Sequence, residues 1–85
     1  MDEQLFAVLV GECGDALKLY IDEAEKTCAM LNECKGKTID LDDRQRIVAQ
    51  RASENNAHQR YMRVRERLFE VVQLGYGSAG ASTHA

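Results

Sequence analysis

The side chains with the greatest potential for chemistry are three cysteines, Cys13, Cys28 and Cys34. They form no C-x-x-C pair and have no histidine at zinc-finger spacing, so the sequence predicts neither a zinc site nor any other metal site. An odd number of cysteines without a secretory leader favours reduced thiols and a cytoplasmic location. We expect Cys13 and Cys34 to pack as small core residues and Cys28 to be exposed.

Acid–base chemistry has little support in the sequence. His58 has Glu54 one helical turn before it but no further ligand nearby, so a packed or partly exposed histidine is the simpler interpretation. Gly-rich phosphate loops and nucleophile motifs are absent. The carboxylates of the first half are spaced like a solvated helix face, and they are Glu12, Asp15, Asp22, Glu23 and Glu25. We therefore expect no enzyme and no cofactor.

Arginine provides the clearest charge pattern. All seven Arg lie between positions 44 and 67, whereas the first half of the chain is acidic and the formal net charge is −3. Arg60, Arg63 and Arg67 share one helical face and are the candidate nucleic-acid contacts. The other interpretation is that the basic second half pairs with the acidic first half inside the molecule. Both interpretations stay open at this point.

Two sets of residues recur every seven positions and indicate how the chain folds. The first set is Phe6, Cys13, Tyr20, Thr27 and Cys34, and the second is Leu41, Val48, Asn55, Met62 and Phe69. A seven-residue repeat is typical of helices that pack along a seam. If the chain reverses near Gly36, Phe6 faces Phe69 and Tyr20 faces Asn55. The sequence thus predicts an all-α fold, an antiparallel two-helix hairpin of the coiled-coil kind, with helices over about 2–34 and 40–74.

Local signals set the ends of these helices. Gly36 suits the left-handed residue that closes a helix, and Asp40 suits an N-cap, with Asp43 three positions later. The polar stretch 53–56 leaves an alternative, a three-helix chain with a break there. We expect one domain over 1–75 and a flexible, Gly- and Ser-rich tail over 76–85.

A single seam cannot cover a chain that is 45% apolar. The stripe of Ala57, Tyr61, Val64 and Leu68 looks distinct from the seam, and Asn55 is expected to fix the register of the packing. We expect the open end of the hairpin to dimerise into a four-helix bundle. The predicted protein interface comprises Leu5, Val8, Leu9, Leu19, Tyr61, Val64, Leu68 and Val72.

These features predict a small helical protein–protein interaction module, such as an adaptor, a chaperone-like factor or an assembly subunit. Its expected partner is a second copy or another protein. The alternative is a hairpin dimer that binds nucleic acid through arginine. The apolar run from Leu5 to Val10 is too short to cross a membrane, so no membrane association is expected.

Overall fold

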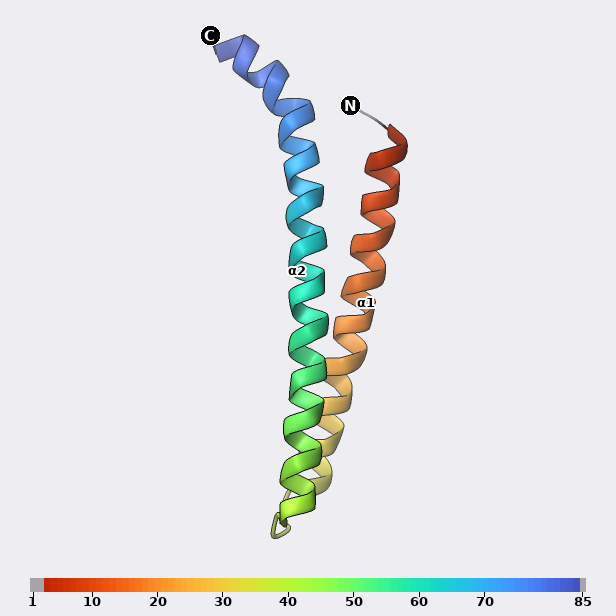
Figure 1. Cartoon of the computed structure of the whole chain (residues 1–85), viewed down its shortest axis with the longest axis vertical. Helices are drawn as coiled ribbons and strands as arrows, with labels where there is room; N and C mark the ends of the chain where they lie inside the picture. The colour runs from red at the N-terminus through yellow and green to blue at the C-terminus, as the bar shows by residue number, and fades with distance from the viewer. Residues whose placement is uncertain (1–2, 85) are drawn as a thin grey trace.

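The computed structural model is a hairpin of two long helices, α1 over Glu3–Cys34 and α2 over Leu41–His84 (Figure 1). It describes the backbone of residues 3–84 and the side chains of residues 3–74. The chain contains no proline, and nothing interrupts the helical hydrogen bonds through 53–56. The all-α antiparallel hairpin is therefore confirmed, and the three-helix alternative is wrong.

The turn between the helices has the predicted chemistry. Gly36 adopts a φ of 79°, the left-handed conformation that ends a helix. The Lys37 amide donates to the Cys34 carbonyl at 3.1 Å. At the start of α2, the Asp43 amide donates to Asp40 Oδ1 at 2.8 Å, and the Asp40 amide donates to Asp43 Oδ2 at 3.4 Å. This reciprocal pair is a capping box, so both predicted helix signals are confirmed.

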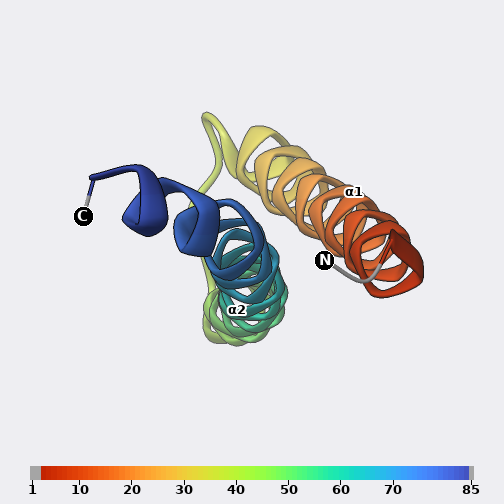
Figure 2. The ribbon, with the colours of Figure 1, turned by 90° about the horizontal axis from the view of Figure 1, so that it is seen from above.

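The second helix runs further than the sequence suggested. We expected an end near Leu74, whereas α2 continues to His84 and bends away from α1 beyond the open end of the hairpin (Figures 1 and 2). The glycines at 75, 77 and 80 disfavour a helix, which is why the sequence predicted an end at Leu74, but no proline stops the helix there. The flexibility expected of 76–85 stays a prediction. Asp2, the expected first residue of helix 1, lies outside the described residues.

One stripe of α1 faces α2 along its whole length. Its members are buried or half-buried and alternate by three and four positions, and they are Phe6, Leu9, Cys13, Ala16, Tyr20, Glu23, Thr27, Met30 and Cys34. This spacing keeps side chains on one side of a helix that packs against another. The predicted seam on α1 is confirmed, and Leu9, at 2% exposure, is its most buried large side chain.

The predicted seam on α2 is wrong. Leu41, Val48, Asn55, Met62 and Phe69 are all exposed, so Phe6 and Phe69 do not meet in the seam. The buried and half-buried residues that alternate by four and three are Asp43, Ile47, Gln50, Glu54, Ala57, Tyr61, Val64, Leu68 and Val71. Three polar residues near the turn masked the apolar signal of this true seam. The stripe that looked like a second surface is therefore the seam itself.

The predicted alignment of α1 and α2 along their length was closer to correct than the predicted face of α2. Tyr20 was expected opposite Asn55, but its ring lies 4.9 Å from the ring of His58 and 6.4 Å from that of Tyr61. These partners lie about one and two helical turns beyond Asn55. Asn55 is exposed and cannot fix the register from a buried position. The two helices lie side by side in both views, with the start of α1 and the end of α2 at the same end of the hairpin (Figures 1 and 2).

Candidate interaction surface

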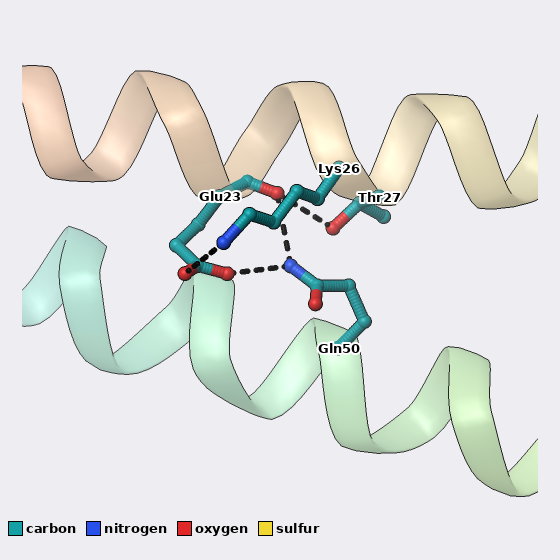
Figure 3. Close-up of polar contacts among 4 residues, drawn as sticks. All are labelled: Glu23, Lys26, Thr27 and Gln50. Carbon is teal, nitrogen blue, oxygen red and sulfur yellow. Dashed lines mark hydrogen bonds and ion pairs between the residues drawn. The ribbon is translucent and has the colours of Figure 1, made fainter.

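A polar cluster joins the two helices in the middle of the seam (Figure 3). Gln50 Nε2 donates to Glu23 Oε2 at 2.6 Å and to the Glu23 carbonyl at 3.1 Å. The same carbonyl accepts from Thr27 Oγ1 at 3.1 Å, and Lys26 Nζ pairs with Glu23 Oε1 at 3.3 Å. Polar groups that satisfy one another inside a seam favour one alignment of the helices over others. Glu23 and Gln50 thus take the role that the sequence assigned to Asn55.

The setting of Glu23 favours its charged form. The Gln50 amide is the main cause that lowers the pKa of Glu23 below its usual value, and the Lys26 ammonium acts in the same direction, while desolvation opposes both. Its side chain is 15% exposed, so the expectation of a solvated carboxylate was wrong for this residue. The sequence contained a signal, because Glu23 lies three positions after Tyr20 and four before Thr27.

A second stripe runs along α1 beside the seam and has no cover within the described chain. Each of its members follows a seam residue by one position, which turns it about 100° around the helix. All eight are uncharged, alternate by three and four, and are Ala7, Val10, Gly14, Leu17, Ile21, Ala24, Cys28 and Leu31. Seven are exposed and Ala24 is half-buried. This set, called here the second stripe, has the pattern of a helix-packing surface.

The second stripe is hollowed in the half nearest the turn. A shallow groove of about 410 Å³ there is lined by Tyr20, Ile21, Ala24, Glu25, Cys28, Ala29 and Asn32. Cys28 is exposed, whereas Cys13 and Cys34 are half-buried, as the sequence predicted. Further along, a Cβ added at Gly14 would meet no atom within 4 Å. The stripe therefore offers both a groove and a smooth section that a second helix could approach closely.

The same flank of the hairpin continues onto α2. Tyr20 contacts His58 there, and His58 belongs to a row that repeats every seven residues with Arg44, Arg51 and Arg65. Outside this basic row lie the exposed residues Leu41, Val48, Asn55, Met62 and Phe69, called here the outer row. The Arg65 guanidinium lies 5.3 Å from the centre of the Phe69 ring. One half of the flank is thus apolar, and the other alternates apolar and basic residues.

The opposite flank is mostly polar. Leu19, Ser53, Asn56 and Arg60 line one depression on it, and Glu33 and Arg46 line another near the turn. Arg60, Arg63 and Arg67 are all exposed on this flank, while Arg44, Arg51 and Arg65 lie on the other. Within the described side chains, the recorded ion pairs, Lys26–Glu23 and Arg46–Asp43, lie inside single helices. The arginines are therefore divided between two surfaces.

The predicted interface residues do not form one surface. Leu9 is buried, and Tyr61, Val64 and Leu68 are half-buried in the seam, where the hairpin itself occupies them. Val72 is half-buried at the edge of the seam. Leu5, Val8 and Leu19 are exposed on the side of α1 turned away from the second stripe. The second stripe was missed, although its spacing of uncharged residues from Ala7 to Leu31 was visible in the sequence.

Residues 3–74 contain no cluster of three His, Cys, Asp or Glu side chains that could hold a metal ion. Neither described helix has a stretch long and apolar enough to cross a bilayer. Comparison with protein-family models, with curated proteins and with solved structures finds no match to this chain.

Proposed function

We propose that this chain is a small helical protein–protein interaction module that covers its second stripe with another polypeptide. Such a module acts as an adaptor, a chaperone-like factor or an assembly subunit. A second copy of the chain is its first expected partner, which would complete a four-helix assembly. The observation that carries this proposal is the uninterrupted set of eight uncharged residues along one uncovered side of α1.

The burial of the hairpin supports the need for a partner. Among the described residues, the buried apolar side chains are Leu9, Ala16 and Ala57, two of them alanines. Val10, Leu17, Ile21 and Leu31 are each at least one-third exposed on the second stripe. Covering one such side chain fully contributes about 1.5–3 kcal/mol, so part of that gain at several positions is large beside the stability of a small domain.

Nucleic-acid binding through Arg60, Arg63 and Arg67 is the second candidate. Their common exposure on one flank favours it. The acidic residues Glu12 and Asp15 of α1 weaken it, because they lie on the side of α1 that adjoins the same flank. A salt titration with random-sequence RNA and DNA tests this candidate. Affinity that falls steeply with salt supports it, and no binding at low salt removes it.

A matched pair of variants tests the main proposal. Ile21 on the second stripe and Leu19 on the opposite flank are 45% and 41% exposed on the same helix. We expect Ile21→Glu to abolish association and leave a helical monomer, because a partner would bury the new charge. We expect Leu19→Glu to sediment like the native chain. Val64→Glu and Leu68→Glu are unsuitable, because these side chains hold the hairpin together.

Sedimentation velocity and circular dichroism at micromolar concentration provide the measurement. Equal association of the native chain and Ile21→Glu would contradict the proposal. The proposal would also be contradicted by a native chain that is a stable folded monomer and that captures the same proteins as Ile21→Glu.

A further inference from the structure

We infer that one flank of the hairpin, formed by the second stripe of α1 and the basic row of α2, binds an acidic amphipathic helix of another protein. The inference rests on the proposed function and specifies the chemistry of the partner. In this complex the bound helix lies along the hairpin as a third helix. Its apolar side chains cover the second stripe, and its Asp or Glu side chains lie opposite the basic row.

The second stripe and the basic row lie beside each other along most of the hairpin. His58 of the basic row contacts Tyr20, which directly precedes Ile21 of the second stripe. At a rise of about 1.5 Å per residue, the second stripe is about 36 Å long and the basic row about 32 Å long. One helix of about 24 residues can therefore contact both of them along their length.

The charge of the basic row is not balanced on this flank. Arg44, Arg51 and Arg65 are exposed, and no Asp or Glu occupies any position of the second stripe, the basic row or the outer row. Within the described side chains, none of the three guanidinium groups has a recorded ion pair. Glu25 lines the groove of α1 but lies further around that helix from α2 than the second stripe does. Carboxylates at seven-residue intervals on a partner helix can therefore pair with these arginines.

Charge complementarity favours this partner over two others. A second copy brings its own basic row to the contact, because that row adjoins the second stripe on the same flank, and like charges then oppose association. Nucleic acid would pair with the arginines and leave the second stripe uncovered, because apolar side chains such as Leu17 and Ile21 do not bind phosphate. An acidic amphipathic helix covers the apolar half of the flank and neutralises the basic half.

A designed helical peptide provides the probe. It is built of seven-residue repeats and is about 28 residues long, with Leu at the stripe positions, Glu on both sides of the stripe and Gln elsewhere. Glu on both sides allows the peptide to bind in either direction, and like charges keep it from pairing with itself. A peptide with Lys in place of every Glu is the matched control. We expect the Glu peptide to bind and the Lys peptide not to bind.

Three variants of the chain locate the bound peptide. Arg51→Glu reverses a charge of the basic row, Arg63→Glu makes the same change on the opposite flank, and Ile21→Glu places a charge on the second stripe. Fluorescence anisotropy of the labelled peptide, with the chain diluted until it is monomeric, measures the dissociation constant. At about 0.15 M salt, where distant charges are screened, we expect Arg51→Glu to raise it at least about fivefold and Arg63→Glu less than about twofold. We expect Ile21→Glu to abolish binding.

Weaker binding in both Arg51→Glu and Ile21→Glu, with Arg63→Glu close to the native chain, supports the inference. It is overturned if neither peptide binds, if the Lys peptide binds as tightly as the Glu peptide, or if Arg51→Glu and Arg63→Glu have equal effects. Each of these three results leaves the proposed function standing when Cys28 of the native chain becomes protected from a thiol reagent as the chain is concentrated.

Random-sequence RNA provides the remaining comparison. If RNA binds the native chain at about 0.15 M salt, and this binding is lost in Arg51→Glu but kept in Ile21→Glu, the flank is a nucleic-acid surface and the inference is overturned. Both proposals are overturned by a native chain that binds neither peptide, stays monomeric when concentrated and captures the same proteins as Ile21→Glu. Circular dichroism shows whether each variant keeps the helical content of the native chain.

Discussion

The two stripes of α1 differ in a way that reverses the usual relation between polarity and burial. The seam stripe includes Tyr20, Glu23 and Thr27 and is covered by α2. The second stripe, one position further along the chain, contains no charged residue and is exposed. The hairpin thus covers the more polar of its two packing surfaces and leaves the more apolar one available. This difference is the basis of the proposal that a second chain covers the second stripe.

The polar residues of the seam explain why it stays within one chain. The Gln50 side chain reaches both the carboxylate and the carbonyl of Glu23, and this pairing requires one alignment of the helices. The second stripe has no comparable group, so its packing depends on shape and apolar contact. In the proposed account, the seam determines the register of the two helices and the second stripe determines association with another chain.

The largest effect on folding should come from the most buried large side chain of the seam. Leu9→Ala should lower the free energy of unfolding by about 2–5 kcal/mol, because Leu9 is nearly fully buried. Leu31→Ala, on the second stripe, is the matched control. When the chain is diluted until it is monomeric, Leu31→Ala should lower the free energy of unfolding much less than Leu9→Ala. When the chain is concentrated, Leu31→Ala should weaken association. Urea unfolding at two chain concentrations measures both effects. If the two substitutions lowered the free energy of unfolding equally in the dilute chain, the distinction between the two stripes would be wrong.

Gln50→Ala should have the next largest effect, smaller than that of Leu9→Ala. It removes two hydrogen bonds between the helices and leaves Glu23 with Lys26 as its cationic partner. Thermal unfolding should show a lower midpoint. Gln45→Ala, at an exposed position of the same helix, provides the control. An unchanged midpoint for Gln50→Ala would show that the polar cluster does not stabilise the seam.

The same cluster predicts a dependence of stability on acid. The pKa of Glu23 is lower in the folded chain than in the unfolded chain, so its contribution is complete above the ordinary glutamate pKa of about 4.3. That contribution disappears as the pH falls through the lowered pKa of the folded state. Unfolding measured from pH 7 to pH 3 should therefore show a smaller acid loss in Gln50→Ala. Parallel curves for the two proteins would contradict this assignment.

Asp40→Ala tests the turn. It should lower the free energy of unfolding by about 1 kcal/mol, because the Asp43 amide loses its hydrogen-bond acceptor at the start of α2. Asp42→Ala removes a carboxylate from the same first turn without removing the cap and should cost less. Urea unfolding distinguishes the two. If Asp40→Ala and Asp42→Ala lowered the free energy of unfolding equally, charge at the helix end, and not the capping box, would stabilise this turn.

Asn55→Leu should have the smallest effect. If Asn55 were buried in the seam, as the sequence suggested, replacing it by Leu would stabilise the chain and loosen the register of the helices. Because Asn55 is exposed, the structure predicts a change within about 0.5 kcal/mol and no change in register. A large rise in the midpoint of thermal unfolding would indicate that another chain covers the outer row of α2.

Sequence reasoning found the elements and half of the seam. The seven-residue repeat of α1, Gly36 and the Asp40–Asp43 box follow from local rules, and these predictions are confirmed. The face of α2 was missed because Leu41, Val48, Met62 and Phe69 are larger and more apolar than Asp43, Gln50 and Glu54. Amphipathic pattern alone assigns the larger side chains to the inside. In the structure, Gln50 enters the seam through its hydrogen bonds with Glu23, which a one-dimensional pattern does not contain.

Cys28 provides the most direct measurement of the central claim, that the second stripe is covered by another chain. Its reaction with a thiol reagent is followed in the native chain over a wide range of concentration, with Ile21→Glu as the reference. We predict that Cys28 reacts quickly in dilute chain and becomes protected as the concentration rises, while Cys28 of Ile21→Glu reacts quickly throughout. Equally fast labelling of Cys28 in the native chain at every concentration would contradict the account.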